Sequence, residues 1–326
     1  MRTRPPVRPE PRTRTLTAAP SLVPLLARGA LLSPLKRPRP DALVPATRLV
    51  LPGVRIDLAH LAAYERACGF PTGADALPLT YPHVLAFPLA MRIMAGRAFP
   101  LPLLGLVHTS IGITRHEGAG ATREYELAVE VGKLAPHRRG TEATVLTEAR
   151  TGGRLVWEST STYLARHRHR PGTPDEARAE AGGDGSRDGS REGNGDGNPR
   201  QEAPPSAPLP SADGPAPLPA VAEWPLAADV GRRYAAVSGD RNPIHLHPLT
   251  ARLFGFPRAI AHGMWTLARC LAEYGPRQAV EVQAEFRAPV LLPGTVTYAE
   301  RGPSFELRSG GRVHLRGEVR PHAPDA

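Results

Sequence analysis

The pattern of hydrophobic and polar positions divides the chain into two blocks of similar order, residues 41–170 and 221–326. In the first block, apolar residues recur at helical spacing over 57–70 and 81–96, and Asp57 is placed to cap the first of these helices. Four stretches that alternate between apolar and polar residues follow, separated by polar or glycine-bearing turns. They predict antiparallel strands at 105–116, 123–134, 141–150 and 155–167.

The second block repeats this order of elements. A loop-rich segment at 231–262 leads into a helical pattern at 263–275, which the pair Gly275–Pro276 ends. Alternating patterns then predict four strands, at 279–290, 295–301, 305–310 and 312–321. Because a helix followed by antiparallel strands occurs twice, the sequence predicts an α+β fold built from an internal repeat.

The segments outside the two blocks are rich in proline, glycine and charge. The chain of 326 residues has 38 prolines and 32 glycines, and nineteen of these lie in residues 171–220. That segment offers too little apolar surface to offset the chain entropy of folding, so we expect a disordered acidic linker. Residues 1–40 open with MRTRPPVRPEPRTRT, and this proline density predicts a disordered basic arm.

Charge and cysteine content narrow the class of protein. The formal net charge of +10 suggests a nucleic-acid-binding protein, but residues 1–60 alone contribute +8. We therefore expect no nucleic-acid partner. DNA binding through residues 1–40 is the last alternative. Two cysteines far apart exclude a disulfide framework and fit a reducing, cytoplasmic compartment. The apolar stretch 22–35 is too short for a membrane span. A transit peptide is a further interpretation of the arginine-rich start.

The densest cluster of reactive side chains lies in residues 234–264. Asp240 and His245 are five residues apart, and Pro243 between them biases Asn242 away from helical geometry. A turn there brings the carboxylate and the imidazole to one small volume, whereas a helix would place them on diverging faces. A carboxylate and an imidazole around one water suit the addition or removal of water by general acid–base catalysis.

A glycine opens the predicted helix that follows this cluster. The first N–H groups of a helix lack intrahelical partners, so the N–H of Gly263 is a candidate oxyanion donor to a carbonyl that becomes an enolate. Simpler interpretations make Asp240 a turn former, His245 a packed histidine and His262 a helix cap. Three histidines near Asp240 also suggest a metal site, but no H-x-x-x-H or cysteine–histidine spacing supports one, so we expect no metal.

Residues 234–264 resemble the signature of MaoC-like (R)-specific enoyl-thioester hydratases and dehydratases. They contain YAAVSGDRNPIH and FGFPRAIAHGM, close to the family pattern Y-x-x-x-S-G-D-x-N-P-I-H followed by G-F-x-x-x-I-A-H-G-M. The resemblance implies a hot-dog fold, in which an antiparallel sheet wraps a central helix, with Asp240 and His245 as the catalytic pair. It also implies that Gly263 supplies the oxyanion N–H and that Asn242 orients the catalytic loop. The motif positions with supporting roles are Tyr234, Ser238 and His262.

The first block resembles the N-terminal half of double hot-dog dehydratases. The similarity lies in TYPHVLAFPLAMRIMA and in FPLPLLGLVHTSIGI, but no G-D-x-N-P-x-x-H occurs there. We therefore expect a degenerate hot-dog half at 41–170 that pairs with a catalytic half at 221–326.

The same resemblance implies an activity in fatty acid or related acyl metabolism. It is the reversible hydration of trans-2-enoyl thioesters to (3R)-3-hydroxyacyl thioesters, with coenzyme A or acyl carrier protein as part of the substrate. We expect no metal and no redox cofactor. A hot-dog acyl-thioesterase and a non-catalytic acyl-thioester-binding subunit are the alternatives. A monomeric double hot dog and a homodimer are both compatible with the sequence.

Overall fold

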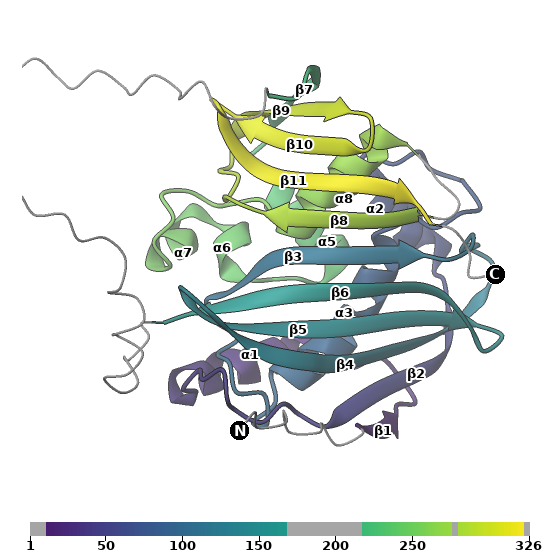
Figure 1. Ribbon diagram of the computed structural model, residues 1–326, viewed down its shortest axis with the longest axis vertical. Coiled ribbons are helices and arrows are strands. Elements are labelled where there is room, and N and C mark those ends of the chain that lie inside the picture. Colours follow the sequence, from purple (N-terminus) through teal and green to yellow (C-terminus); the bar gives the residue numbers. More distant parts are fainter. Residues whose placement is uncertain (1–10, 168–216, 276–279, 323–326) are drawn as a thin grey trace, which may run out of the picture. The chain divides into compact units, whose positions relative to one another are not determined.

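The computed structural model describes residues 11–167, 217–275 and 280–322, and within them eleven strands form one sheet (Figure 1). The strands of the first half are β1 (Arg12–Thr15), β2 (Thr47–Arg55), β3 (Leu106–Arg115), β4 (Glu124–His137), β5 (Gly140–Thr151) and β6 (Arg154–Arg166). Those of the second half are β7 (Ala220–Leu226), β8 (Val280–Phe286), β9 (Gly294–Arg301), β10 (Ser304–Ser309) and β11 (Arg312–Pro321).

The order of the strands repeats on the two sides of the sheet. Outward from the middle it is β3-β6-β5-β4-β2-β1 in the first half and β8-β11-β10-β9-β7 in the second. Taken in chain order, β2 to β6 therefore occupy the same places as β7 to β11. The halves meet where β3 pairs antiparallel with β8, in a register that places Ser110 opposite Glu285. This topology confirms the predicted repeat and the double hot-dog class.

Each half has a long helix behind the sheet, and its sequence explains where that helix lies (Figure 1). Helix α3 (Tyr81–Met94) belongs to the first half and α8 (Gly263–Tyr274) to the second. The apolar face of α8 is buried, with Leu267 and Ala268 fully enclosed. Helix α2 (Leu58–Cys68) begins at the predicted cap, because the carboxylate of Asp57 accepts hydrogen bonds from two backbone N–H groups.

The prediction of a disordered arm over residues 1–40 is wrong for the part that the structure describes. Strand β1 adds to the edge of the sheet in parallel pairing with β2, and α1 (Leu22–Leu32) continues into a short 3-10 helix (Ser33–Leu35). Pro24 lies in the first turn of α1, where its missing N–H breaks no helical hydrogen bond. Gly29 packs so closely on Leu103 that an added Cβ would lie 2.3 Å from that side chain.

Beyond β1, α1 and the 3-10 helix, the structure adds five elements to those predicted. Strands β2 and β7 precede the helices of their halves, and α5 (Val230–Ser238) lies within the segment predicted to be loop-rich. Short helices α6 (Pro243–Leu246) and α7 (Pro248–Leu253) follow it. Of the predicted linker at 171–220, residues 171–216 lie outside the described residues, and β7 begins at its last position. Among the described helices, none is both long and apolar enough to cross a membrane.

Candidate active site

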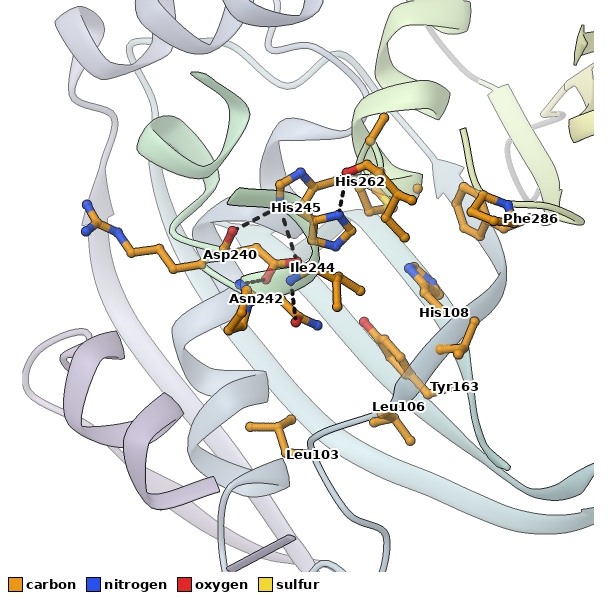
Figure 2. A pocket seen from close by; sticks show the side chains of 18 of the residues that line it. Leu103, Leu106, His108, Tyr163, Asp240, Asn242, Ile244, His245, His262 and Phe286 are labelled. Atoms are coloured by element: carbon orange, nitrogen blue, oxygen red, sulfur yellow. Dashed lines mark hydrogen bonds and ion pairs between the residues drawn. The ribbon is translucent and has the colours of Figure 1, made fainter. Parts of the chain in front are cut away.

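A cavity of about 480 Å³ lies between the two halves. Most of the site residues predicted from the sequence line it. The second half contributes the loop before α6 and the start of α8, and the first half contributes residues of α1, α3, β3 and β6 (Figure 2). Lining residues from the sequence motif are Asp240, Asn242, His245, His262 and Gly263.

The loop that carries Asp240 is held by hydrogen bonds to its own neighbours. Helix α5 ends at Gly239, whose φ of 73° is the left-handed conformation that glycine adopts readily. The N–H of Asp240 donates to the hydroxyl of Ser238, and the N–H of Asn242 donates to the Asp240 carboxylate at 3.1 Å. The side chain of Asn242 then caps α6 by accepting from Ile244, at 3.4 Å. These bonds direct the carboxylate toward the cavity.

The hydrogen bond made by His245 determines which of its ring nitrogens is available. Its Nδ1 lies 2.8 Å from the backbone oxygen of Ile260, and a carbonyl oxygen only accepts, so Nδ1 carries the proton. In the neutral ring, Nε2 therefore keeps its lone pair. Burial lowers the pKa of His245, and the nearby carboxylate of Asp240 opposes this effect only in part. The side chain is thus a neutral base near pH 7.

His262 contacts both His245 and Asp240. Its ring stacks on the ring of His245 with the centroids 3.7 Å apart, and its Nε2 donates to the backbone oxygen of Asp240 at 2.9 Å. Burial and the neighbouring His245 lower the pKa of His262 to about 3, so it stays uncharged. Its side chain does not cap α8, contrary to the simpler interpretation of this residue. The ring of Tyr234 lies beside the ring of His262, with the two centroids 4.9 Å apart.

Asp240, His245 and His262 each offer one ligand atom, and these atoms lie within 4.8 Å of one another. The Asp240 side chain is 32% exposed, whereas the two imidazoles are buried, so the carboxylate is open to the cavity. A single water between a carboxylate and the Nε2 of His245 fits this arrangement. The same atoms are compatible with a metal ion, and the expectation of a metal-free site stays a prediction.

Gly263 is the first residue of α8, so its N–H has no carbonyl one turn earlier to bond within the helix. The glycine lines the cavity, and a Cβ at this position would lie 3.1 Å from the ring of Phe286. The absence of a side chain therefore leaves room for a ligand atom to approach the N–H.

The sequence did not predict that the first half would contribute polar side chains to this cavity. His83 of α3, His108 of β3 and Tyr163 of β6 line it, and Figure 2 shows His108 and Tyr163 on the opposite side of the view from Asp240. His83 lies within TYPHVLAF, the segment that carries the resemblance of the first block to its family. That segment was the available signal, but without a catalytic motif it does not mark His83 as a residue of the cavity.

Comparison with known proteins agrees with this fold and site. A family model described as the MaoC like domain matches residues 216–301. The 3-hydroxyacyl-thioester dehydratase X of Mycobacterium tuberculosis is 33% identical over 291 residues, which cover 87% of this chain and 92% of that protein. The chain therefore belongs to the MaoC-like dehydratase family.

Solved structures agree with this assignment. The crystal structure of HtdX of Mycobacterium tuberculosis matches with a TM-score of 0.66 and 30% identity, covering 84% of this chain and all of that one. A MaoC-like dehydratase from Phytophthora capsici matches with a TM-score of 0.59, over 87% of this chain and 98% of its own, at 16% identity. The second similarity concerns the fold alone.

Proposed function

We propose that this chain catalyses the reversible hydration of trans-2-enoyl thioesters to (3R)-3-hydroxyacyl thioesters, as a hydro-lyase. The observation that carries the proposal is the free Nε2 of His245, held beside the Asp240 carboxylate at a cavity that the start of α8 also lines. Together these groups supply a base, a carboxylate that can hold the water, and an N–H that can stabilise a developing oxyanion. The name of the dehydratase from Mycobacterium tuberculosis supports the same reaction.

In hydration, Asp240 and His245 position one water against C3 of the substrate. His245 accepts a proton at Nε2 while the water oxygen bonds to C3, and the electron pair of the double bond moves toward the thioester carbonyl. The Gly263 N–H stabilises the resulting enolate oxygen, and the proton held by His245 returns to C2. The Asp240 carboxylate stabilises the imidazolium that exists between these steps. Dehydration uses the same steps in reverse.

The substrate brings its own carrier, coenzyme A or acyl carrier protein. Water addition moves no electrons to or from the protein, so the proposal includes no redox cofactor, and His245 activates the water without a metal. Both halves of the cavity come from one chain, which suits a monomer and also permits a homodimer. We place the protein in the cytoplasm, a proposal supported by its two cysteines, which are buried and free.

The pH dependence of hydration should follow the ionisation of His245. The base must be neutral, so kcat/KM is full above its pKa and falls as the pH drops through it. Because burial lowers this pKa in the fold, the acidic limb of the profile should lie below pH 6.5. A profile of kcat/KM against pH measures this, and an acidic limb above pH 6.5 would contradict the assignment.

Replacing Gly263 with alanine should lower kcat between about 10- and 100-fold with little change in stability. The new Cβ would lie 3.1–3.3 Å from the Phe286 ring and beside the N–H, so the carbonyl of the substrate is held away from its donor. Gly120→Ala is the matched control, because its Cβ meets nothing closer than 3.6 Å. Steady-state kinetics and thermal unfolding of both variants test this, and equal kcat in the two would remove Gly263 from the mechanism.

The proposal is tested by incubating the protein with trans-2-enoyl-CoA and identifying the products by chromatography with a chiral standard. The expected product is (3R)-3-hydroxyacyl-CoA with the thioester intact. Release of free coenzyme A would instead favour an acyl-thioesterase. Tight binding without turnover at any chain length would favour a non-catalytic binding subunit.

A further inference from the structure

The rim of the substrate cavity consists of the lining residues that are also exposed. They are Ala27 on α1, Arg166 at the end of β6, Arg241 before α6 and Arg287 after β8. Three of these four are arginines, and among the described residues that line the cavity the one carboxylate is that of Asp240. The rim is therefore positively charged.

Helix α1 forms one side of the rim, and the segment from Arg241 through α6 forms another. Helix α7 packs against α6, where the hydroxyl of Thr250 donates to the backbone oxygen of Pro243 at 2.6 Å. Figure 1 shows α1, α6 and α7 at one end of the sheet, the end at which β3 begins. A partner that covers the opening therefore meets both α1 and α7.

The chain around the rim carries positive charge without acidic residues. Residues 11–40 hold six lysines and arginines, and residues 241–272 hold four arginines, with no aspartate or glutamate in either segment. The exposed arginines there and at the rim include Arg28 of α1, Arg166, Arg241 and Arg252 of α7. None of these four forms a salt bridge with another described residue. Their charge therefore acts on a partner that approaches the opening.

The same two helices also expose large apolar side chains. Leu31 of α1 is 78% exposed and Leu253 of α7 is 83% exposed. Val23 of α1 and Leu249 of α7 are exposed as well, and so is Phe254 at the end of α7. Exposed apolar side chains grouped beside charged ones are typical of a surface that binds another macromolecule.

We call the exposed side chains of this region the docking surface. It consists of Arg28 and Leu31 of α1, the rim residues Arg166 and Arg241, and Arg252 and Leu253 of α7.

The chemistry of the docking surface matches one kind of carrier better than the other. The proposed substrate is a thioester, which is held by coenzyme A or by a carrier protein. Coenzyme A carries its charge in phosphates, which bind best where several donors converge. The four arginines instead lie on separate elements, and α1 and α7 each present a leucine beside an arginine. An acidic protein surface pairs with both kinds of side chain.

We infer that the docking surface binds an acidic acyl carrier protein, which inserts its acyl thioester into the cavity between α1 and α6. The chain then uses acyl groups on this carrier in preference to the same groups on coenzyme A. This inference rests on the proposed function, because it assumes that a thioester enters at the rim. An anionic membrane is a less suitable partner, since membrane lipids hold their acyl chains as esters or amides.

The test compares one trans-2-enoyl chain on two carriers, a purified acidic acyl carrier protein and coenzyme A. At low salt, kcat/KM for the protein-bound chain should exceed that for the coenzyme A thioester by about tenfold or more, through faster association. The ratio of the two values should fall toward one as sodium chloride rises to about 500 mM, because salt screens exposed charges.

Two substitutions outside the cavity lining test the docking surface itself. Arg28→Glu and Leu253→Ser should each lower the ratio of kcat/KM between the two carriers by about fivefold or more. The matched controls are Arg123→Glu and Leu58→Ser, both at exposed positions. Arg123 precedes β4 and Leu58 follows β2, at the end of these strands away from the rim. Both controls should keep the ratio within about twofold of the wild type.

Calorimetry with a saturated acyl chain on the carrier protein makes the test independent of turnover. If neither thioester is hydrated, the proposed function fails, and docking is then judged by Kd, which should be weaker in Arg28→Glu than in Arg123→Glu. Equal kcat/KM for the two carriers at low salt overturns the inference. So does an equal loss of the ratio in the docking variants and their controls. Binding to phosphatidylglycerol vesicles that Arg28→Glu abolishes, with no preference between carriers, would assign the surface to a membrane instead.

Discussion

Asp240→Asn should lower kcat/KM for enoyl-CoA hydration by about a thousandfold. The asparagine keeps the shape of the side chain, and its oxygen still accepts from the N–H of Asn242, so the loop should keep its conformation. The lost charge leaves the imidazolium of His245 without its stabilising partner and the attacking water with a weaker acceptor. Initial rates of hydration, with unfolding midpoints for both proteins, measure this effect.

The matched control for this variant is Asp229→Asn. Asp229 lies at the other end of α5, outside the cavity, and pairs with Arg233 on the surface at 3.3 Å. Its replacement changes the same charge and should leave kcat/KM within about twofold, because exposed ion pairs contribute little. Equal losses in the two variants would show that net charge, and not the position of Asp240, controls the rate.

His245→Gln should lower kcat by about a thousandfold as well, with a smaller change in KM. The amide of glutamine can donate to the backbone oxygen of Ile260, as Nδ1 of His245 does, but it offers no base to the water. The residual rate should also lose the acidic limb of the pH profile. Steady-state kinetics across pH measure both effects.

His247→Gln is the control for this change, two residues further along the chain. His247 is exposed, and its Nδ1 accepts from the N–H of Leu249 at the start of α7. The variant should keep near-wild-type kcat. A His245→Gln protein that retains more than a tenth of the wild-type kcat would assign the base to another residue.

Much of the fold follows from local sequence patterns. Alternating residues place β3 to β6 and β8 to β11 within a few positions of their ends, and Asp57 marks the start of α2. The equal order of elements in the two blocks anticipates the equal strand order of the two halves. These features are local, because side-chain periodicity and caps act within one or two turns or strands.

The features that the sequence did not predict depend on contacts far apart in the chain. Helix α1 lies in a proline-rich segment, and its Gly29 packs closely on Leu103, a contact that no local pattern indicates. Strand β1 gains its partner only from the edge of β2. In this segment, contacts between residues far apart in the chain determine the structure more than the local proline content does.

The same division holds for the candidate site. The turn at Asn242 and Pro243 was enough to predict that Asp240 and His245 face one cavity. The tautomer of His245 was not predictable, because it depends on the carbonyl of Ile260, fifteen residues away. His108 of the first half reaches the cavity on β3, whose pairing with β8 joins segments far apart in the chain.

Addition of water across the double bond of an enoyl thioester can be followed in water enriched in oxygen-18. Wild-type protein is incubated with trans-2-enoyl-CoA in this solvent, and the products are analysed by mass spectrometry. Hydration at this site should place one labelled oxygen in the hydroxyl at C3 of a product that is still a thioester. Label in the carboxylate of a released fatty acid, or an unlabelled substrate recovered unchanged, would contradict it.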